Sequence, residues 1–549
     1  MGYYGEPFTA EERSILARHF TNLDGPVFAL VNLPEVIKGA LFARYSRSAK
    51  SMRRLFLDEF VDGPGAALWL DGQGRAGERA VFDTDHATEL FDRIFSEYGD
   101  DSVAQLGGAH VACEQASNIL TKVLERGRLA SYLEQSTRYI YFDKPLGGSY
   151  RYGLPPEIAA GSALATACRA TMDQLFDTYK ELVPPLAQHY GDLHPRPAGV
   201  AESVWKASVR ARVCDDLRGL LPAATISNVG IYASGQAFEA LLLRMRAHGL
   251  QEVRDYGDLL LVELRKVIPS FLKRVDLPQR GARWSRYFAE IDASMRAAGA
   301  ALDEPAPRRP EVLLVEWDAE AEVKLVAAAL YAYCQLPDDR LLAMARAMTA
   351  AARNAIIARY CGDRENRRHR PGRALERVCY RFDVLAPYSV FRDLQRHRLL
   401  TVEWQTLSTL HGYDVPEAVE EIGGGAIGRW QSAMGAAAEL YEQVKRARGE
   451  SVAQYVVPFA FKIRFNWQVN AREAFHILEL RTQSGGDPAY RRICQEMHRL
   501  IREQAGHAAI ADAMKFVDTG SYELGRLAGE RRAAERRAAL LEVPGGTNG

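Results

Sequence analysis

The sequence lacks long hydrophobic runs, an excess of either charge, and closely paired cysteines. No stretch approaches the ~18 consecutive apolar residues of a membrane-spanning helix. Lys and Arg together number 70, as do Asp and Glu, so the zero net charge argues against a dedicated nucleic-acid-binding protein. The seven cysteines never form C-x-x-C, so no zinc or other metal site is predicted.

The composition is that of an ordinary globular protein, with 47% hydrophobic and 26% charged residues in a chain of 549. The start of the chain, Met1–Glu6, lacks the basic-then-apolar layout of a secretory signal. Scattered cysteines suit a reducing compartment. We therefore expect a cytoplasmic protein with neither membrane nor nucleic acid among its partners.

Apolar residues recur mostly at helical spacing, as in residues 235–247, 318–334 and 471–481. Alternation typical of strands is rarer, and residues 139–142 and 377–382 carry the better examples. The pattern indicates an α+β protein. A proline-rich stretch near the midpoint predicts a linker, because proline cannot continue a helix. The predicted organisation is an N-terminal domain (1–300), a linker (301–310), a C-terminal domain (311–530) and a tail (531–549).

An internal repeat links the two halves. The segment 124–139 aligns without gaps on 394–409, so that Arg126 falls on Arg396 and Arg128 on Arg398. A linker between two similar segments is typical of a duplicated domain. We infer that the halves are diverged copies of one domain.

The repeated segment carries residues that bind anions. Guanidinium groups form planar forks that match phosphate, so an Arg-x-Arg pair can clamp a phosphorylated ligand. The first copy adds Glu134, Ser136 and Arg138, which can hold the sugar, base or phosphate of a nucleotide. A solvated helix end with surface salt bridges is the alternative interpretation of any single pair.

These residues resemble a known signature. Arg396-His397-Arg398-x-x-Thr401 and Glu134-x-Ser136-x-Arg138-Tyr139 are similar to the R-H-R-x-x-S and E-x-S-x-R-Y motifs of the flavin-dependent thymidylate synthases, the ThyX family. The flanking segments that also resemble the family are 99–103, 386–392, 470–472 and 478–481. The resemblance implies two tandem ThyX-like domains, mainly helical, with a small mixed sheet in each.

The departures from the signature are divided between the copies. The first copy has Gly127 in place of the motif histidine. The second has Trp404 for the glutamate, Ser408 for the arginine, and Gln454 where the first copy has Arg218. In the family one subunit supplies R-H-R and a late arginine, and another supplies E-x-S-x-R. The resemblance therefore implies one composite site formed between the two halves.

The resemblance also implies a reaction and its participants. The family converts dUMP to dTMP with FAD, methylenetetrahydrofolate and NADPH, and its four-domain assembly implies a homodimer of this duplicated chain. The implied roles are FAD binding by Arg396, His397, Arg398, Asn470, Arg472 and His476, and nucleotide binding by Glu134, Ser136, Arg138, Arg218 and Asp393. Arg481, with Arg396, is the implied catalytic arginine, and its first-copy counterpart is either Arg244 or Arg246.

Two alternatives stay open. Asp393 stands where the family usually has Gln, and a carboxylate beside the nucleotide repels phosphate. A different pyrimidine nucleotide or nucleoside is therefore an alternative acceptor. The replaced motif residues also suit a non-catalytic nucleotide-binding relative.

Overall fold

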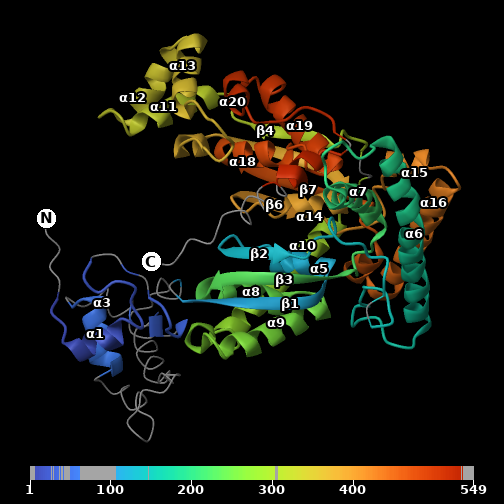
Figure 1. Cartoon of the computed structure of the whole chain (residues 1–549), viewed down its shortest axis with the longest axis horizontal. Helices are drawn as coiled ribbons and strands as arrows, with labels where there is room; N and C mark the ends of the chain where they lie inside the picture. The colour runs from blue at the N-terminus through green and yellow to red at the C-terminus, as the bar shows by residue number, and fades with distance from the viewer. Residues whose placement is uncertain are drawn as a thin grey trace, which may run out of the picture. The chain divides into compact units, whose positions relative to one another are not determined.

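The computed structural model forms two compact units (Figure 1). The first unit comprises residues 1–114, 127–134 and 228–303, and the second comprises 115–126, 135–227 and 304–549. The second unit resumes inside the stretch predicted as a linker and also takes in much of the first copy. The structure describes residues 6–25, 28, 30–35, 37–38, 41, 50–61, 105, 107–145, 147–302, 304, 307–522, 524–532 and 535, so the segment 99–103 and nearly all of the tail lie outside it.

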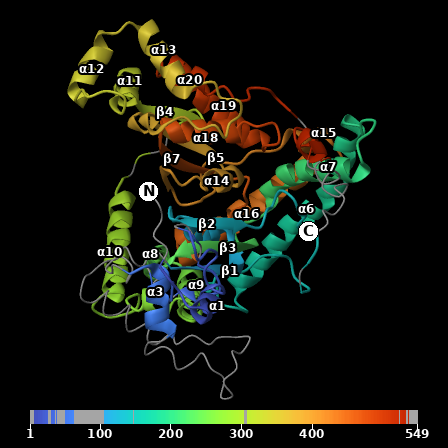
Figure 2. The same ribbon diagram turned by 60° about the vertical axis from the view of Figure 1, so that its left-hand side comes forward.

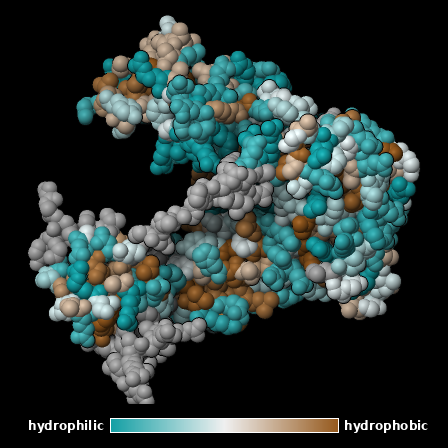
Figure 3. Space-filling view, in the orientation of Figure 1, coloured by the Kyte–Doolittle hydropathy of each residue, from teal (hydrophilic) through white to brown (hydrophobic). Residues whose placement is uncertain are grey.

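The first unit contains most of a three-stranded sheet in the order β1-β3-β2. In β3, alternate residues Val229, Ile231 and Ala233 are buried, whereas Tyr232 and, on the paired strand, Leu133 are exposed on the other face. Figure 3 shows hydrophobic side chains at the surface over these strands. The described elements of this unit are α1 (Ala10–Leu16), α3 (Met52–Phe56), η1 (Leu57–Val61), β1 (Gly108–Ser117), β2 (Ala130–Glu134), β3 (Ile226–Ser234), α8 (Gly235–Ala247), α9 (Gln251–Arg265), η5 (Pro269–Leu272) and α10 (Gly281–Ala300).

The second unit is built around a four-stranded sheet in the order β4-β5-β7-β6, with every described pairing antiparallel. Its strands are β4 (Val312–Trp317), β5 (Cys379–Pro387), β6 (Leu400–Trp404) and β7 (Lys462–Asn470). Buried Phe465 and Trp467 of β7 contribute to its core. Figure 2 shows two helices of this unit, α18 (Ala471–Arg481) and α19 (Pro488–Glu503), beside the sheet.

The remaining helices of the second unit surround this sheet and the segments of the first copy. Long α6 packs along α16, and the two lie side by side in both ribbon views (Figures 1 and 2). These helices are α5 (Asn118–Leu124), α6 (Ala163–Leu193), α7 (Glu202–Leu217), η4 (Arg218–Leu220), α11 (Ala321–Tyr331), α12 (Asp338–Ala347), α13 (Ala350–Cys361), η6 (Arg373–Arg377), α14 (Tyr388–Leu394), α15 (Glu417–Glu421), α16 (Ala426–Arg448), α17 (Glu450–Ala453), η7 (Gln454–Val456) and α20 (Ala508–Ala513). Within the described residues, no helix is both long and apolar enough to cross a membrane.

The predicted repeat is present in the elements themselves. Helices α5 and α14 have equal lengths and start 270 residues apart, at Asn118 and Tyr388, and β2 matches β6 in the same way. Strands β3 and β7 have nine residues each and lead directly into α8 and α18. Counted from the starts of these helices, Arg481 falls on Met245, so neither Arg244 nor Arg246 is its counterpart.

Equivalent segments of the two copies also bind each other within the second unit. Pro222 bridges Pro458, the residue at the same place in the other copy. The flanking backbone bonds are reciprocal: Ala223 N donates to Val457 O and Phe459 N to Leu221 O, both at 2.9 Å. Such exchange of identical contacts defines a local two-fold relationship, as in an isologous dimer interface. The duplication thus places an internal pseudo-dimer interface inside one chain.

Two sequence-based predictions are corrected. The α+β class is confirmed, but the described strand pairs are antiparallel rather than mixed. Residues 139–142, predicted as a strand, form none: Tyr139 ends a turn in which Ser136 Oγ accepts a hydrogen bond from Arg138 N at 3.1 Å. This local bond bends the chain and overrides the strand preference of the aromatic residues. The predicted strand 377–382 is confirmed from Cys379 onward.

A glycine at the pseudo-dimer interface tests this packing. A Cβ at Gly219 would lie 2.9 Å from Trp430 and 3.2 Å from the Ala460 side chain. We expect Gly219→Ala to destabilise the protein by about 1–3 kcal/mol through overpacking. The measurement is the urea unfolding midpoint, with Gly435→Ala as the control. That residue lies within α16 with open space around it, so alanine there should stabilise by roughly 0.5–1 kcal/mol. Equal stability of the two variants would contradict the close approach.

Candidate active site

The Arg-His-Arg motif lies on the turn between α14 and β6. Its three side chains differ in exposure, because Arg396 is half-buried, His397 is buried and Arg398 is exposed. The turn thus displays two guanidinium groups on either side of a buried imidazole. This arrangement suits an anionic ligand that lies along the turn.

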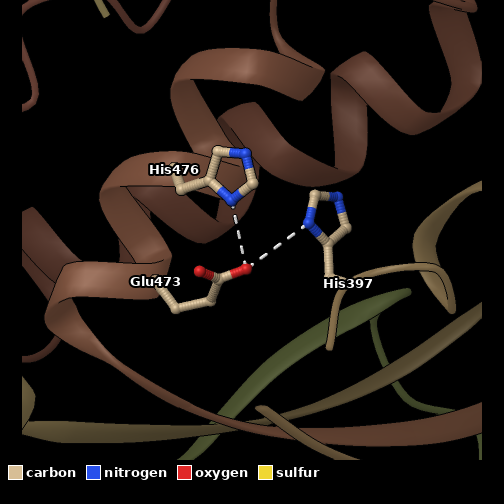
Figure 4. A group of neighbouring side chains, drawn as sticks. All are labelled: His397, Glu473 and His476. Atoms are coloured by element: carbon tan, nitrogen blue, oxygen red, sulfur yellow. Dashed lines mark hydrogen bonds and ion pairs between the residues drawn. The ribbon is translucent and has the colours of Figure 1, made fainter. Parts of the chain in front are cut away.

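His397 is held by two hydrogen-bonding partners. Arg481 Nε donates to His397 Nε2 at 2.9 Å, so the ring proton is assigned to Nδ1, which faces Glu473 Oε1 at 3.6 Å (Figure 4). Burial lowers the pKa of His397 to about 4, against a smaller opposing effect of Glu473. The imidazole is therefore neutral near pH 7, and it accepts a hydrogen bond from Arg481.

Glu473, near the start of α18, contacts two histidines, His397 of the motif turn and His476 of the same helix. That helix begins with the side chain of Asn470 accepting from Glu473 N at 2.9 Å, which aims Glu473 toward the motif turn. Glu473 Oε1 also lies 3.2 Å from His476 Nδ1 (Figure 4). Burial raises the pKa of Glu473, but bonds to His397 and His476 outweigh it and lower the value to about 2. Glu473 is thus an ionised carboxylate between two imidazoles.

These three side chains have the composition of a metal site, since one ligand atom from each lies within 4.8 Å of the others. A metal ion at Nδ1 of His397 requires a proton on Nε2. That nitrogen instead accepts the hydrogen bond from Arg481. Metal binding here competes with the Arg481 contact, so the observed bonding favours a positioning role for the cluster.

Arg218 is the most enclosed of the predicted site residues, with 1% of its surface exposed. Its Nη1 donates to Asp393 at 2.9 Å and its Nη2 to Asp487 at 2.8 Å. Burial acts to raise the pKa of Asp393, but Arg218, Arg138 and further arginines hold it well below its usual range. Asp393 is consequently ionised and paired with Arg218, which it shares with Asp487.

Arg138 also uses its guanidinium nitrogens for hydrogen bonds within the protein. Its Nε and Nη2 donate to the two carboxylate oxygens of Asp215 at 2.6 and 2.8 Å. Its third nitrogen, Nη1, donates to the hydroxyl of Tyr490 at 2.9 Å. The bidentate pair with Asp215 fixes the plane of the guanidinium group.

Tyr490 connects residues from the two copies. Its ring lies 5.3 Å from the guanidinium carbon of Arg138 and 5.4 Å from that of Arg481. Arg481 Nη2 donates to the backbone oxygen of Asp393 at 2.6 Å. Arg138 of the first copy therefore lies close to the Arg481–His397 pair of the second, as a composite site requires.

The other predicted residues belong to the first unit or have local partners. Glu134 is buried at the end of β2 in the first unit. Asn470 caps α18, and Arg472 binds Pro371 O at 3.0 Å and Glu376 at 3.2 Å. Ser136 stabilises the turn before Arg138.

Four residues of the cluster were missed in the sequence: Asp215, Glu473, Asp487 and Tyr490. The Asp487-Pro488 pair is a helix-start signal that was available. It predicts the helix but not the contact with Arg218, because that partner lies far away in the chain.

Neither of the two reciprocal positions carries a charge. Gln454 stands in place of Arg218, and Val123 occupies the place in α5 that Asp393 has in α14. Gln454 Oε1 instead accepts from Leu407 N at 3.0 Å. A buried charge without its partner costs about 3–5 kcal/mol, so two such positions are expected to carry both charges or neither.

The fold and the site define a duplicated α+β protein whose arginines converge from two copies of one domain. Both copies match the thymidylate synthase complementing protein family, over residues 61–270 and 313–506. The chain belongs to this family. The resemblance to ThyX and the tandem duplication are thereby confirmed.

Two relatives align with this chain over nearly their whole length, and so across both copies of the domain. The UPF0159 protein of Chlamydia muridarum is 38% identical over 530 residues, which are 96% of this chain and 98% of the relative. The UPF0159 protein of Thermoplasma acidophilum is 30% identical over 519 residues, 90% of this chain and 98% of the relative. A flavin-dependent thymidylate synthase of Clostridium tetani is 25% identical over 185 residues, 33% of this chain and 68% of the relative.

The lowered pKa of His397 predicts a pH-dependent stability. The unfolded chain binds a proton at this histidine below about pH 6.5, whereas the folded chain resists it until about pH 4, so stability is lost as the pH falls between these values. Between roughly pH 7 and 5, we expect the free energy of unfolding to fall by about 2 kcal/mol more in the wild type than in His397→Gln. Urea unfolding of both proteins at the two pH values measures this difference. Parallel losses in wild type and variant would show that His397 titrates normally.

Proposed function

We propose that the protein is a flavin-dependent methyltransferase that converts dUMP to dTMP, with methylenetetrahydrofolate as one-carbon donor and NADPH as reductant. The observation that carries the proposal is the meeting of Arg138 with Arg481 and His397 around Tyr490. The arginines lost from each copy are those that this single composite site does not need. The Clostridium tetani relative, a flavin-dependent thymidylate synthase by name, supports the proposal of a flavin cofactor.

The motif turn fits FAD. Half-buried Arg396 and exposed Arg398 offer guanidinium groups for the pyrophosphate, and neutral His397 lies between them without adding charge. When bound, FAD supplies the redox chemistry of the reaction. The protein's contribution is to bind and orient both ligands.

Arg481 is suited to the uracil ring. His397 and the Asp393 carbonyl fix its Nε and Nη2, and among the described residues its Nη1 has no hydrogen-bond partner. A guanidinium group held in this way can stabilise negative charge that develops on a carbonyl oxygen of the substrate. Arg138 then serves the phosphate through Nη1, and Arg218 keeps Asp393 from repelling it.

A second acceptor is supported by one specific observation. Arg218, expected to bind the nucleotide, has both terminal nitrogens on carboxylates and almost no exposed surface. A site with fewer phosphate ligands than expected also suits another pyrimidine nucleotide or a nucleoside. Flavin oxidation that depends on that acceptor and not on dUMP would select this alternative.

The primary test combines absorbance with complementation. We expect the purified protein, incubated with FAD, to show bound-flavin absorbance that changes on titration with dUMP. Expression should also rescue a thymidine auxotroph. A colourless protein that cannot be loaded with FAD would overturn the proposal.

The duplicated motif provides a matched pair of substitutions. Arg396→Ala should lower kcat/KM at least ~100-fold, because it removes an anion ligand from the composite site. Arg126→Ala, at the same motif position of the other copy, removes an exposed pair with Glu403 and a contact with the Trp404 ring at 5.2 Å, and it should change activity by less than about threefold. Formation of dTMP by the FAD-loaded proteins is the measurement. Equal damage by both substitutions would contradict the division of roles.

Arg138 requires a milder change, since alanine would leave Asp215 buried without its main partner. Arg138→Lys keeps a positive charge but loses the planar fork. We expect a folded protein with dTMP formation reduced at least ~10-fold.

A further inference from the structure

The first turn of α19 is a rigid platform beside the arginines. Asp487 caps the helix, with Oδ1 accepting from Ala489 N at 2.8 Å and from Tyr490 N at 3.4 Å. Its other oxygen, Oδ2, binds buried Arg218 at 2.8 Å. Asp487 therefore fixes the backbone position from which Tyr490 projects.

Tyr490 is itself buried, with 4% of its surface exposed, and its hydroxyl is the third ligand of Arg138. Asp215 occupies the other two nitrogens, so the tyrosine sits on the one nitrogen of Arg138 that no carboxylate uses. The hydroxyl accepts this bond. Among the described residues, none accepts the hydroxyl's own hydrogen, which stays available as a donor.

A phenol donor next to one nitrogen of a guanidinium group suits a phosphate. Nη1 carries two hydrogens and gives one to Tyr490, which leaves the other beside the phenolic O–H. Hydrogen bonds from such groups to a phosphate oxygen are charge-assisted and short. The ring of the same tyrosine lies near Arg481, which we assign to the base. One side chain thus lies close to both ends of a bound nucleotide.

We propose that the Tyr490 hydroxyl, together with Arg138 Nη1, binds the phosphate of the nucleotide substrate. This inference rests on the proposed function and adds a residue that the signature motifs do not contain. Arg218 already binds two carboxylates, so the Tyr490 hydroxyl, a neutral group, supplies a hydrogen-bond donor for the phosphate in its place. It is a binding residue, so its loss should raise KM and leave kcat nearly unchanged.

The test uses FAD-loaded full-length protein and the variant Tyr490→Phe, which keeps the ring and removes only the hydroxyl. Dissociation constants for dUMP, deoxyuridine and inorganic phosphate are measured from changes in flavin absorbance or by competition with dUMP. We expect the value for dUMP to rise about tenfold and that for deoxyuridine to stay the same. A rise for inorganic phosphate alone would overturn the nucleotide assignment.

Tyr152→Phe is the matched control. Its hydroxyl donates to Asp173 at 2.8 Å, on α6 and apart from the arginine cluster, so its removal should leave all three constants unchanged. Equal weakening of dUMP and deoxyuridine by Tyr490→Phe, or no weakening, would overturn the phosphate assignment while leaving the proposed function intact. Absence of dUMP binding by the wild-type protein would overturn both.

Discussion

One buried guanidinium group holds the candidate site together. Arg218 forms ion pairs with Asp393 on α14 and with Asp487, the capping residue of α19, both in the second copy. The backbone oxygen of Asp393 binds Arg481, and Asp487 caps the helix that carries Tyr490. Two buried carboxylates without Arg218 would repel each other and carry a large desolvation penalty. The positions of Arg481 and Tyr490 therefore depend on this one ion-paired arginine, whereas Arg138 is fixed by Asp215.

The duplication explains why only one such cluster is found among the described residues. Two identical subunits would form two equal sites across their interface, and the reciprocal bonds between Leu221–Ala223 and Val457–Phe459 retain that symmetry. The Arg218–Asp393 ion pair breaks that symmetry, because the residues at the reciprocal positions are Gln454 and Val123. Since a lone buried charge is costly, a change at one of the two positions favours a matching change at the other. Fusion of the copies allows this asymmetry, because each half then evolves independently.

Local patterns in the sequence predicted local structure well. The helices 235–247 and 471–481 match residue for residue, because each follows a capping side chain, Ser234 or Asn470. The convergence of Arg138 with the second copy was predicted from the divided motif. Its partners were not, since Tyr490 lies 352 residues from Arg138 and no periodicity connects them. Pairing of buried charges depends on tertiary geometry that spacing along the chain does not contain.

The proposed site binds an anion without an excess of positive charge. Each buried arginine described in the cluster has a carboxylate or a carbonyl partner, in keeping with the zero net charge of the chain. Long-range attraction of a phosphate is therefore small, and selectivity rests on the few donors that the internal pairs leave available. Donors fixed in advance by such pairs lose little entropy when a ligand binds. In the proposed site, internal ion pairing thus exchanges electrostatic attraction for geometric precision, which is consistent with a neutral phenol beside Arg138.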